Sequence, residues 1–216
     1  MTTDEITPEL MLHAYASGIF PMAENRDDPD LFWVDPRRRG VFPLDGFHIS
    51  RSLARKMRKG GYRVALDEDF SGTVAACGDR DETWINPTLR DLYQALHRLG
   101  FAHSFEIRGT IDNALWGAVF GIALGGAFFG ESMVSGRTDG SKIALAHLVD
   151  HLRRAGFTLF DTQFITPHLA TLGAVEIPRA AYRRRLEIAL ARQGRFTRTR
   201  LEQDPYSVIQ RNTQTS

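Results

Sequence analysis

Residues 113–134, NALWGAVFGIALGGAFFGESMV, decide the fold class of this chain. The eighteen residues up to Gly130 carry no charge, which is near the lower length limit of a membrane-spanning helix. Five glycines and several aromatic residues within them favour two buried strands instead. We therefore expect a β-hairpin with strands over 113–123 and 126–134, turning at Gly125 and Gly126, and no membrane anchor.

Helical and extended patterns alternate on both sides of this hairpin. The apolar spacing predicts helices over 7–17, 49–59, 70–77, 87–99, 141–155, 167–172 and 179–193. Strands are expected over 62–66, 103–108 and 157–162, the last so apolar that both sheet faces must be covered. The pattern predicts an α/β (α+β) protein with a mixed sheet flanked by helices.

The same pattern predicts three segments along the chain. Residues 1–60 form a small, loop-rich N-terminal lobe, because prolines, glycines and acids interrupt 20–46. Residues 61–195 form the main domain. Residues 196–216 have no clear pattern, and we expect a mobile tail there.

Composition limits the classes of function. The 216 residues are 43% hydrophobic and 25% charged, as in globular proteins. The one cysteine, Cys77, excludes an intramolecular disulfide, and the seven histidines lack metal-ligand spacing, so we expect no metal site. The acidic N-terminus is unlike a secretory signal, which favours a cytoplasmic protein.

The net charge of +1 hides a basic block. Residues 51–64, RSLARKMRKGGYRV, hold six basic residues and no acid. They are Arg51, Arg55, Lys56, Arg58, Lys59 and Arg63. Such a cluster fits a polyanion such as RNA, or it is the solvated face of a helix. Charge alone leaves both interpretations open.

Polar residues at the ends of apolar strands are the candidate catalytic groups. Glu131 closes AFFGESM, and Asp161 and Gln163 close FTLFDTQ. In an extended strand Asp161 and Gln163 face the same way, so the carboxylate could orient the amide beside an attacking group. Hydrogen bonds to nearby backbone are the alternative.

The segment from Arg137 to Lys142, RTDGSK, partly resembles the pyrophosphate loop of the GNAT acetyltransferases. Lys142 stands where that loop needs a small residue, which disfavours coenzyme A. A CoA-dependent N-acyltransferase nevertheless stays an alternative, as does a tRNA-binding protein without catalysis.

An ordered set of short motifs runs over about residues 10–185. It includes Ala14-Tyr-x-x-Gly18-Ile-Phe-Pro21, His48-Ile-Ser-Arg-Ser52, Thr83-Trp-Ile85, Gly130-Glu-Ser-Met133, Asp161-x-Gln163 and Ile177-Pro-Arg179. This set resembles the bacterial leucyl/phenylalanyl-tRNA–protein transferase family. The resemblance implies a GNAT-like C-terminal domain after a small lobe. It implies transfer of Leu or Phe, less often Met, from aminoacyl-tRNA to proteins that begin with Arg or Lys, which marks them for N-degron degradation. No cofactor is implied, and we expect a monomer.

The resemblance also implies roles for individual residues. Gln163 would meet the incoming amine, oriented by Asp161, while Glu131 would face the cationic peptide end. An aminoacyl pocket would be formed by Val119, Phe120, Phe128, Gly130, Met133, Leu145, Leu148 and Phe160. Trp33 and Trp84 would stack on the terminal adenosine of tRNA or be core aromatics. The six basic residues of 51–64 would hold the tRNA backbone.

Overall fold

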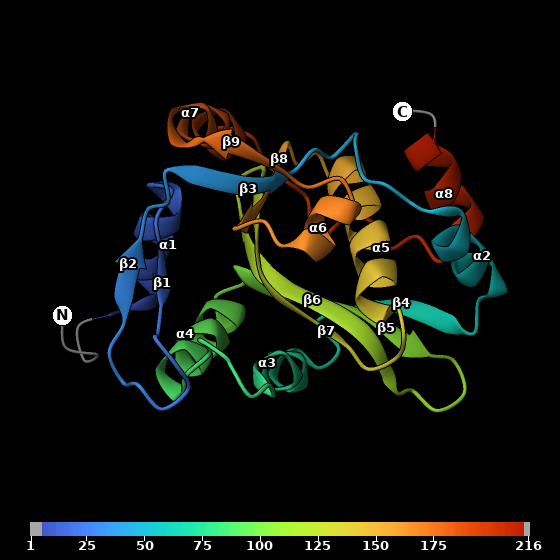
Figure 1. The fold of residues 1–216 in the computed structure, drawn as a ribbon, viewed down its shortest axis with the longest axis horizontal. Coiled ribbons are helices and arrows are strands. Elements are labelled where there is room, and N and C mark those ends of the chain that lie inside the picture. Colours follow the sequence, from blue (N-terminus) through green and yellow to red (C-terminus); the bar gives the residue numbers. More distant parts are fainter. Residues whose placement is uncertain (1–5, 214–216) are drawn as a thin grey trace.

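A seven-stranded mixed sheet organises the computed structural model, which describes residues 6–213 (Figure 1). Its strands lie in the order β4-β5-β6-β7-β8-β3-β9. Their bounds are β3 Arg38–Phe42, β4 Tyr62–Leu66, β5 Ala102–Gly109, β6 Leu115–Leu124, β7 Ala127–Ser135, β8 Leu159–Gln163 and β9 Val175–Pro178. Only β7 and β8 run parallel; the other neighbours are antiparallel. The predicted mixed α/β architecture is confirmed.

Helices cover both faces of the sheet (Figure 1). The core on one face takes side chains from α2 Arg51–Lys59, α5 Gly140–Arg154, α6 Pro167–Thr171 and α8 Pro205–Thr213. The core on the other face takes side chains from α1 Pro8–Ala16, α3 Phe70–Gly78, α4 Pro87–Arg98 and α7 Arg179–Leu190. A sheet with apolar residues on both faces requires this double cover.

The apolar segment forms the predicted hairpin of β6 and β7. The two strands pair from Gly117 opposite Ser135 to Leu124 opposite Ala127. Gly125 makes the turn at a positive φ of 58°, which glycine adopts without strain. Within residues 6–213, no helix has the length and apolarity that a membrane crossing requires.

The N-terminal lobe is smaller than the residues 1–60 that the sequence predicts, because part of this region belongs to the main sheet and its core. It holds α1 and a two-stranded antiparallel sheet of β1 Phe20–Met22 and β2 Phe32–Val34. Strand β3 already belongs to the main sheet, and α2 packs Leu53, Ala54 and Met57 into its core. The difference arises because short apolar runs such as Val41 and Phe42 carry little periodicity.

The expectation of a mobile tail is wrong for residues 196–213. Phe196, Val208 and Ile209 are buried in the core beside α5. Arg211 binds the buried carboxylate of Asp150 at 2.5 Å and also Glu202 at 3.0 Å. The three buried apolar residues are spread over fourteen positions without a regular pattern, so the sequence did not reveal this packing. Residues 214–216 lie outside the described part.

Candidate active site

A crevice opens where β7 and β8 separate. The two parallel strands pair from Ala127 opposite Leu159 to Phe129 opposite Asp161, and the ladder ends there. Glu131 on β7 and Gln163 on β8 each lie two residues beyond the last pair. In α/β sheets, ligands bind in the crevice outside the carboxyl ends of such strands. The predicted catalytic residues therefore meet at this crevice: Glu131 lines the open space, and Asp161 and Gln163 are buried beside it.

Gln163 leaves the strand in a tight turn. Its φ is +62°, and the Phe164 amide donates to the Thr162 carbonyl at 2.6 Å, which makes a γ-turn centred on Gln163. A carboxylate oxygen of Asp161 accepts from the Gln163 backbone amide at 2.7 Å. This backbone conformation is energetically unfavourable for a residue other than glycine, and residues with such strain are often found at functional sites.

The expected hydrogen bond from Asp161 to the Gln163 amide side chain is replaced by a different one. The turn redirects the Gln163 side chain, and its Nε2 donates to both carboxylate oxygens of Glu131 at 3.1 Å. Asp161 thus holds the backbone of Gln163, and Glu131 orients its carboxamide. The prediction assumed an extended backbone at Gln163, and the positive φ invalidates that assumption.

Glu131 is a buried carboxyl group that titrates near neutral pH. Its side chain accepts a hydrogen bond from the Tyr93 hydroxyl at 2.7 Å. Burial raises the pKa of Glu131 to about 7, while the hydrogen bonds from Tyr93 and Gln163 oppose this rise. Both protonation states are therefore populated at neutral pH, as general acid–base catalysis requires.

Asp161 belongs to a fully buried ionic network behind the crevice. The Arg39 guanidinium donates to its two oxygens at 2.6 to 3.1 Å, and the Tyr182 hydroxyl donates at 2.7 Å. Arg39 also donates to the Gly18 carbonyl at 2.9 Å and lies 4.5 Å from the ring centres of Phe20 and Tyr182. The network ties the N-terminal segment and α7 to β8 just before the turn.

Sequence reasoning missed three members of this site: Arg39, Tyr93 and Tyr182. Arg39 is 1% exposed although it lies in the run Arg37–Arg39, which looks like a solvated turn. The available signal was its position directly before the apolar strand residues 40–42. Tyr93 and Tyr182 read as core residues of helices, and nothing in the sequence shows that their hydroxyls reach carboxylates.

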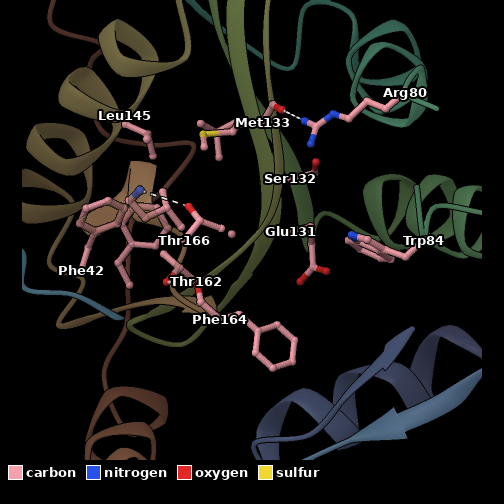
Figure 2. Close-up of a pocket in the computed structure, with 14 residues that line it drawn as sticks. Phe42, Arg80, Trp84, Glu131, Ser132, Met133, Leu145, Thr162, Phe164 and Thr166 are labelled. Carbon is pink, nitrogen blue, oxygen red and sulfur yellow. Dashed lines mark hydrogen bonds between the residues drawn. The ribbon is translucent and has the colours of Figure 1, made fainter. Parts of the chain in front are cut away.

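An apolar cavity of about 190 Å³ continues inward from the crevice (Figure 2). Its apolar wall is formed by Phe42, Val119, Met133, Leu145, Phe160 and Leu169. Glu131, Arg80 and Trp84 line its other side. Gly130 keeps the cavity open, because a Cβ there would lie 2.8 Å from the Phe160 ring. The arrangement can hold an apolar side chain next to a titratable carboxyl group.

Five of the eight predicted pocket residues line this cavity: Val119, Gly130, Met133, Leu145 and Phe160. Three do not. Phe120 lies in the core on the opposite face of the sheet, because neighbouring strand residues point to opposite sides. Phe128 and Leu148 are fully buried in the core and absent from the cavity wall.

The two tryptophans take different places. Trp84, in the loop between α3 and α4, lines the cavity and lies with its ring centre 6.4 Å from that of Tyr93. Trp33, on β2, packs against the core that α1 and α4 share. Only Trp84 is therefore placed to contact a molecule in the crevice.

The predicted basic helix is α2. Its exposed cations are Arg51, Arg55, Arg58 and Lys59. Lys56 binds the Asp139 carboxylate at 2.8 Å, and Arg63 on β4 binds Glu68 at 2.6 Å. Their charges are therefore partly neutralised, whereas the helix still presents a continuous cationic face.

One cluster in residues 6–213 has metal-like spacing: Asp67, His97 and His103. The Nδ1 of His103 lies 2.7 Å from Asp67 and its Nε2 lies 3.1 Å from the Gly100 carbonyl. Both nitrogens of His103 are thus used in hydrogen bonds. The cluster shares no residue with the crevice, so we assign it no part in the chemistry.

The fold and crevice define a class: mixed α/β proteins whose sheet opens between two parallel strands over an apolar cavity, an arrangement suited to group transfer. The crystal structure of FemX has a similar fold, with a TM-score of 0.52 over 77% of this chain and 65% of that chain at 12% identity.

The chain belongs to the leucyl/phenylalanyl-tRNA protein transferase family. The family matches residues 41–187, and its N-terminal domain matches residues 4–37, up to the start of β3. Relatives with the name leucyl/phenylalanyl-tRNA–protein transferase include one from Cereibacter sphaeroides, 64% identical over the whole of both chains. Another, from Ruegeria pomeroyi, is 64% identical over 98% of this chain and 99% of its own. The resemblance found in the sequence motifs is confirmed.

Proposed function

We propose that this protein transfers Leu or Phe, and less often Met, from aminoacyl-tRNA to the N-terminal amine of proteins that begin with Arg or Lys. The observation that carries the proposal is the apolar cavity directly beside the Glu131–Gln163 pair in the crevice. The product carries a new apolar N-terminus, which in this family marks proteins for degradation by the N-degron pathway.

The reaction exchanges an ester for an amide. The neutral amine of the acceptor attacks the carbonyl carbon of the aminoacyl ester, a C–N bond forms, and the C–O bond to the terminal ribose breaks. Glu131 can take the proton that the amine loses and return it to the ribose oxygen, because its pKa of about 7 allows both steps. Gln163 donates its Nε2 to Glu131, and no hydrogen bond to its carbonyl oxygen occurs within residues 6–213, so this oxygen can orient the amine.

The cavity supports selection of the donor by size and apolarity. Its wall residues Val119, Gly130, Met133, Leu145 and Phe160 present no charge. A side chain without a branch at Cβ, such as Leu, Phe or Met, can extend into it. We expect β-branched Ile and Val to be rejected, because their branch at Cβ makes the side chain wide and stiff next to the ester.

The tRNA would be held outside the crevice. Trp84 at the mouth offers a ring for the terminal adenosine. The exposed cations of α2 offer sequence-independent phosphate contacts, which suit an enzyme that accepts several tRNAs. Lys56 and Arg63 can add to this field once phosphate competes with their acidic partners.

Further parts of the proposal follow from the chemistry. The opening between two parallel strands supports a GNAT-like description of the sheet domain. The aminoacyl ester is already activated, so the reaction needs no cofactor. A single chain builds the whole crevice, which favours a monomer, and the need for charged tRNA favours the cytoplasm.

The test incubates the purified protein with Phe-tRNA or Leu-tRNA carrying a labelled amino acid and a peptide beginning with Arg. We expect label on the peptide, lost after ribonuclease treatment and absent with an N-terminally acetylated peptide. Acetyl-CoA is offered in parallel. Acetylation of the peptide without aminoacyl transfer would replace the proposal by a CoA-dependent acyltransferase.

A further inference from the structure

A groove of about 400 Å³ leaves the catalytic cavity along β7. It shares Arg80 and Met133 with the cavity, so the two spaces are neighbours on either side of this pair. Ala76 of α3 forms one wall, Ser135 marks the far end of β7, and His168 of α6 lies on the other side. The mechanism above does not use this space.

The wall along β7 is an open strand edge. Beyond Phe129 the strand has no ladder partner on the β8 side in the described chain. From Glu131 to Ser135 this edge is about 13 Å long at a rise of about 3.3 Å per residue. That length exceeds the about 6.8 Å that two nucleotides span at the duplex spacing of about 3.4 Å each, so two nucleotides of a more extended single strand have room along it.

One cation, Arg80, lines the groove, and Lys142 lies near it. The Arg80 guanidinium reaches across to the Met133 carbonyl. Burial, and then the positive charge of Lys142, lower the pKa of His168, which favours its neutral imidazole form in the groove wall. Lys142 itself binds Asp139 at 2.9 Å, and Asp79 is the one acid in the groove wall.

At its far end the groove meets the loop from β7 to α5, and a second cleft lies across this loop. The cleft has a volume of about 730 Å³ and is lined by Lys56, Lys59, Trp116 and Arg137. Arg137 stacks on the Trp116 ring at 4.4 Å. Lys56 and Lys59 belong to α2, so the cleft connects the groove with the basic helix.

We propose that this groove and cleft hold the unpaired 3′ end of tRNA, with the two nucleotides before the terminal adenosine lying along β7 between Ala76 and His168. The inference rests on the proposed function. It assigns the strand a path from the cavity, over the β7–α5 loop, to the cationic face of α2. The Trp116–Arg137 pair offers a stacking surface at the point where the strand leaves the groove.

The charge of the path favours RNA over the acceptor peptide. The acceptor begins with Arg or Lys, and a route past Arg80, Lys59 and Arg137 would repel it. A phosphate chain is attracted by the same groups.

A bulky side chain in the groove tests the path. We compare two donors, Phe-tRNA and 3′-phenylalanyl-adenosine, which ends at the cavity and never enters the groove. Ala76→Trp fills the groove, whereas Ala75→Trp places the same side chain at an exposed neighbouring position of α3 that does not line it. We expect Ala76→Trp to lower kcat/KM with Phe-tRNA about tenfold more than with phenylalanyl-adenosine, because base stacking and phosphate contacts are lost.

The outcomes separate the possibilities. The Ala75→Trp variant should have the same kcat/KM as the unchanged protein with both donors. Activity with phenylalanyl-adenosine shows that each variant is folded. Equal changes with the two donors would overturn the inference, and a raised KM for the peptide in Ala76→Trp would assign the groove to the acceptor. If the unchanged protein uses neither donor, the proposed function itself fails, which is a different result.

Discussion

Replacing Asp161 with Ala should greatly lower the free energy of unfolding, because the change leaves a guanidinium buried without its partner charge. Asp161 is fully buried, and Arg39 beside it is 1% exposed. Breaking a buried ion pair by removing one partner costs about 3–5 kcal/mol. The free energy of unfolding of a typical domain is about 5–15 kcal/mol. We therefore expect a folded variant that has lost a large part of its stability.

The double variant Arg39→Met, Asp161→Ala should lose less free energy of unfolding than the sum of the losses in the two single variants. Arg39→Met leaves the Asp161 carboxylate with only the Tyr182 hydroxyl and the Gln163 amide. The double variant leaves no buried unpaired charge. We expect a coupling energy of about 2–3 kcal/mol between the two positions.

Urea unfolding followed by far-ultraviolet circular dichroism measures these free energies. The matched control is the exposed pair of Arg38 on β3 and Glu176 on β9, at the other edge of β3; these two side chains bind at 3.0 Å but are 58% and 37% exposed. Its coupling in Arg38→Met and Glu176→Ala should be about 0–1 kcal/mol. Additive effects at Arg39 and Asp161 would refute the argument that this pair acts as one buried unit.

Three further predictions concern the site. The pKa of Glu131 is about 7 when folded against an ordinary 4.5, so its stabilising contribution is full below about pH 4.5 and is lost as pH rises through 7. Glu131→Gln should therefore gain about 2 kcal/mol relative to the unchanged protein between pH 5 and 8 in urea unfolding, and it should lose the rise of transfer rate with pH near 7; an unchanged pH profile contradicts this role. Gly130→Ala should narrow the cavity and lower kcat/KM more for Phe-tRNA than for Leu-tRNA; an equal loss would place the donor side chain elsewhere. Changing Arg51, Arg55 and Lys59 together to Ala should flatten the slope of log K for tRNA binding against log salt by about 2–3, and an unchanged slope would move the RNA contact away from α2.

Strong periodicity made much of the fold predictable. The uncharged run with paired glycines predicted β6 and β7, and the apolar stripe of 141–155 predicted α5. Short elements were harder. Strands β3 and β9 and the packed tail depend on contacts with distant segments, and local spacing does not contain that information.

The site was predictable in its composition but not in its geometry. Glu131, Asp161 and Gln163 stand at strand ends, which is a visible signal. The turn at Gln163 is not visible, because glutamine has no preference for a positive φ; the conformation is held by the Asp161 carboxylate and by the γ-turn hydrogen bond, which show only in the structure. Arg39 was missed for a related reason, since a buried arginine is recognisable only beside its partner.

The interaction at the centre of the account is the hydrogen bond between Gln163 and Glu131 at the opening of β7 and β8. Single-turnover transfer from Phe-tRNA to an Arg-peptide, measured for Gln163→Ala beside the unchanged protein, tests it most directly. The account predicts that the rate of transfer falls by at least about 100-fold while tRNA binding is retained. Transfer by Gln163→Ala at the rate of the unchanged protein would contradict it.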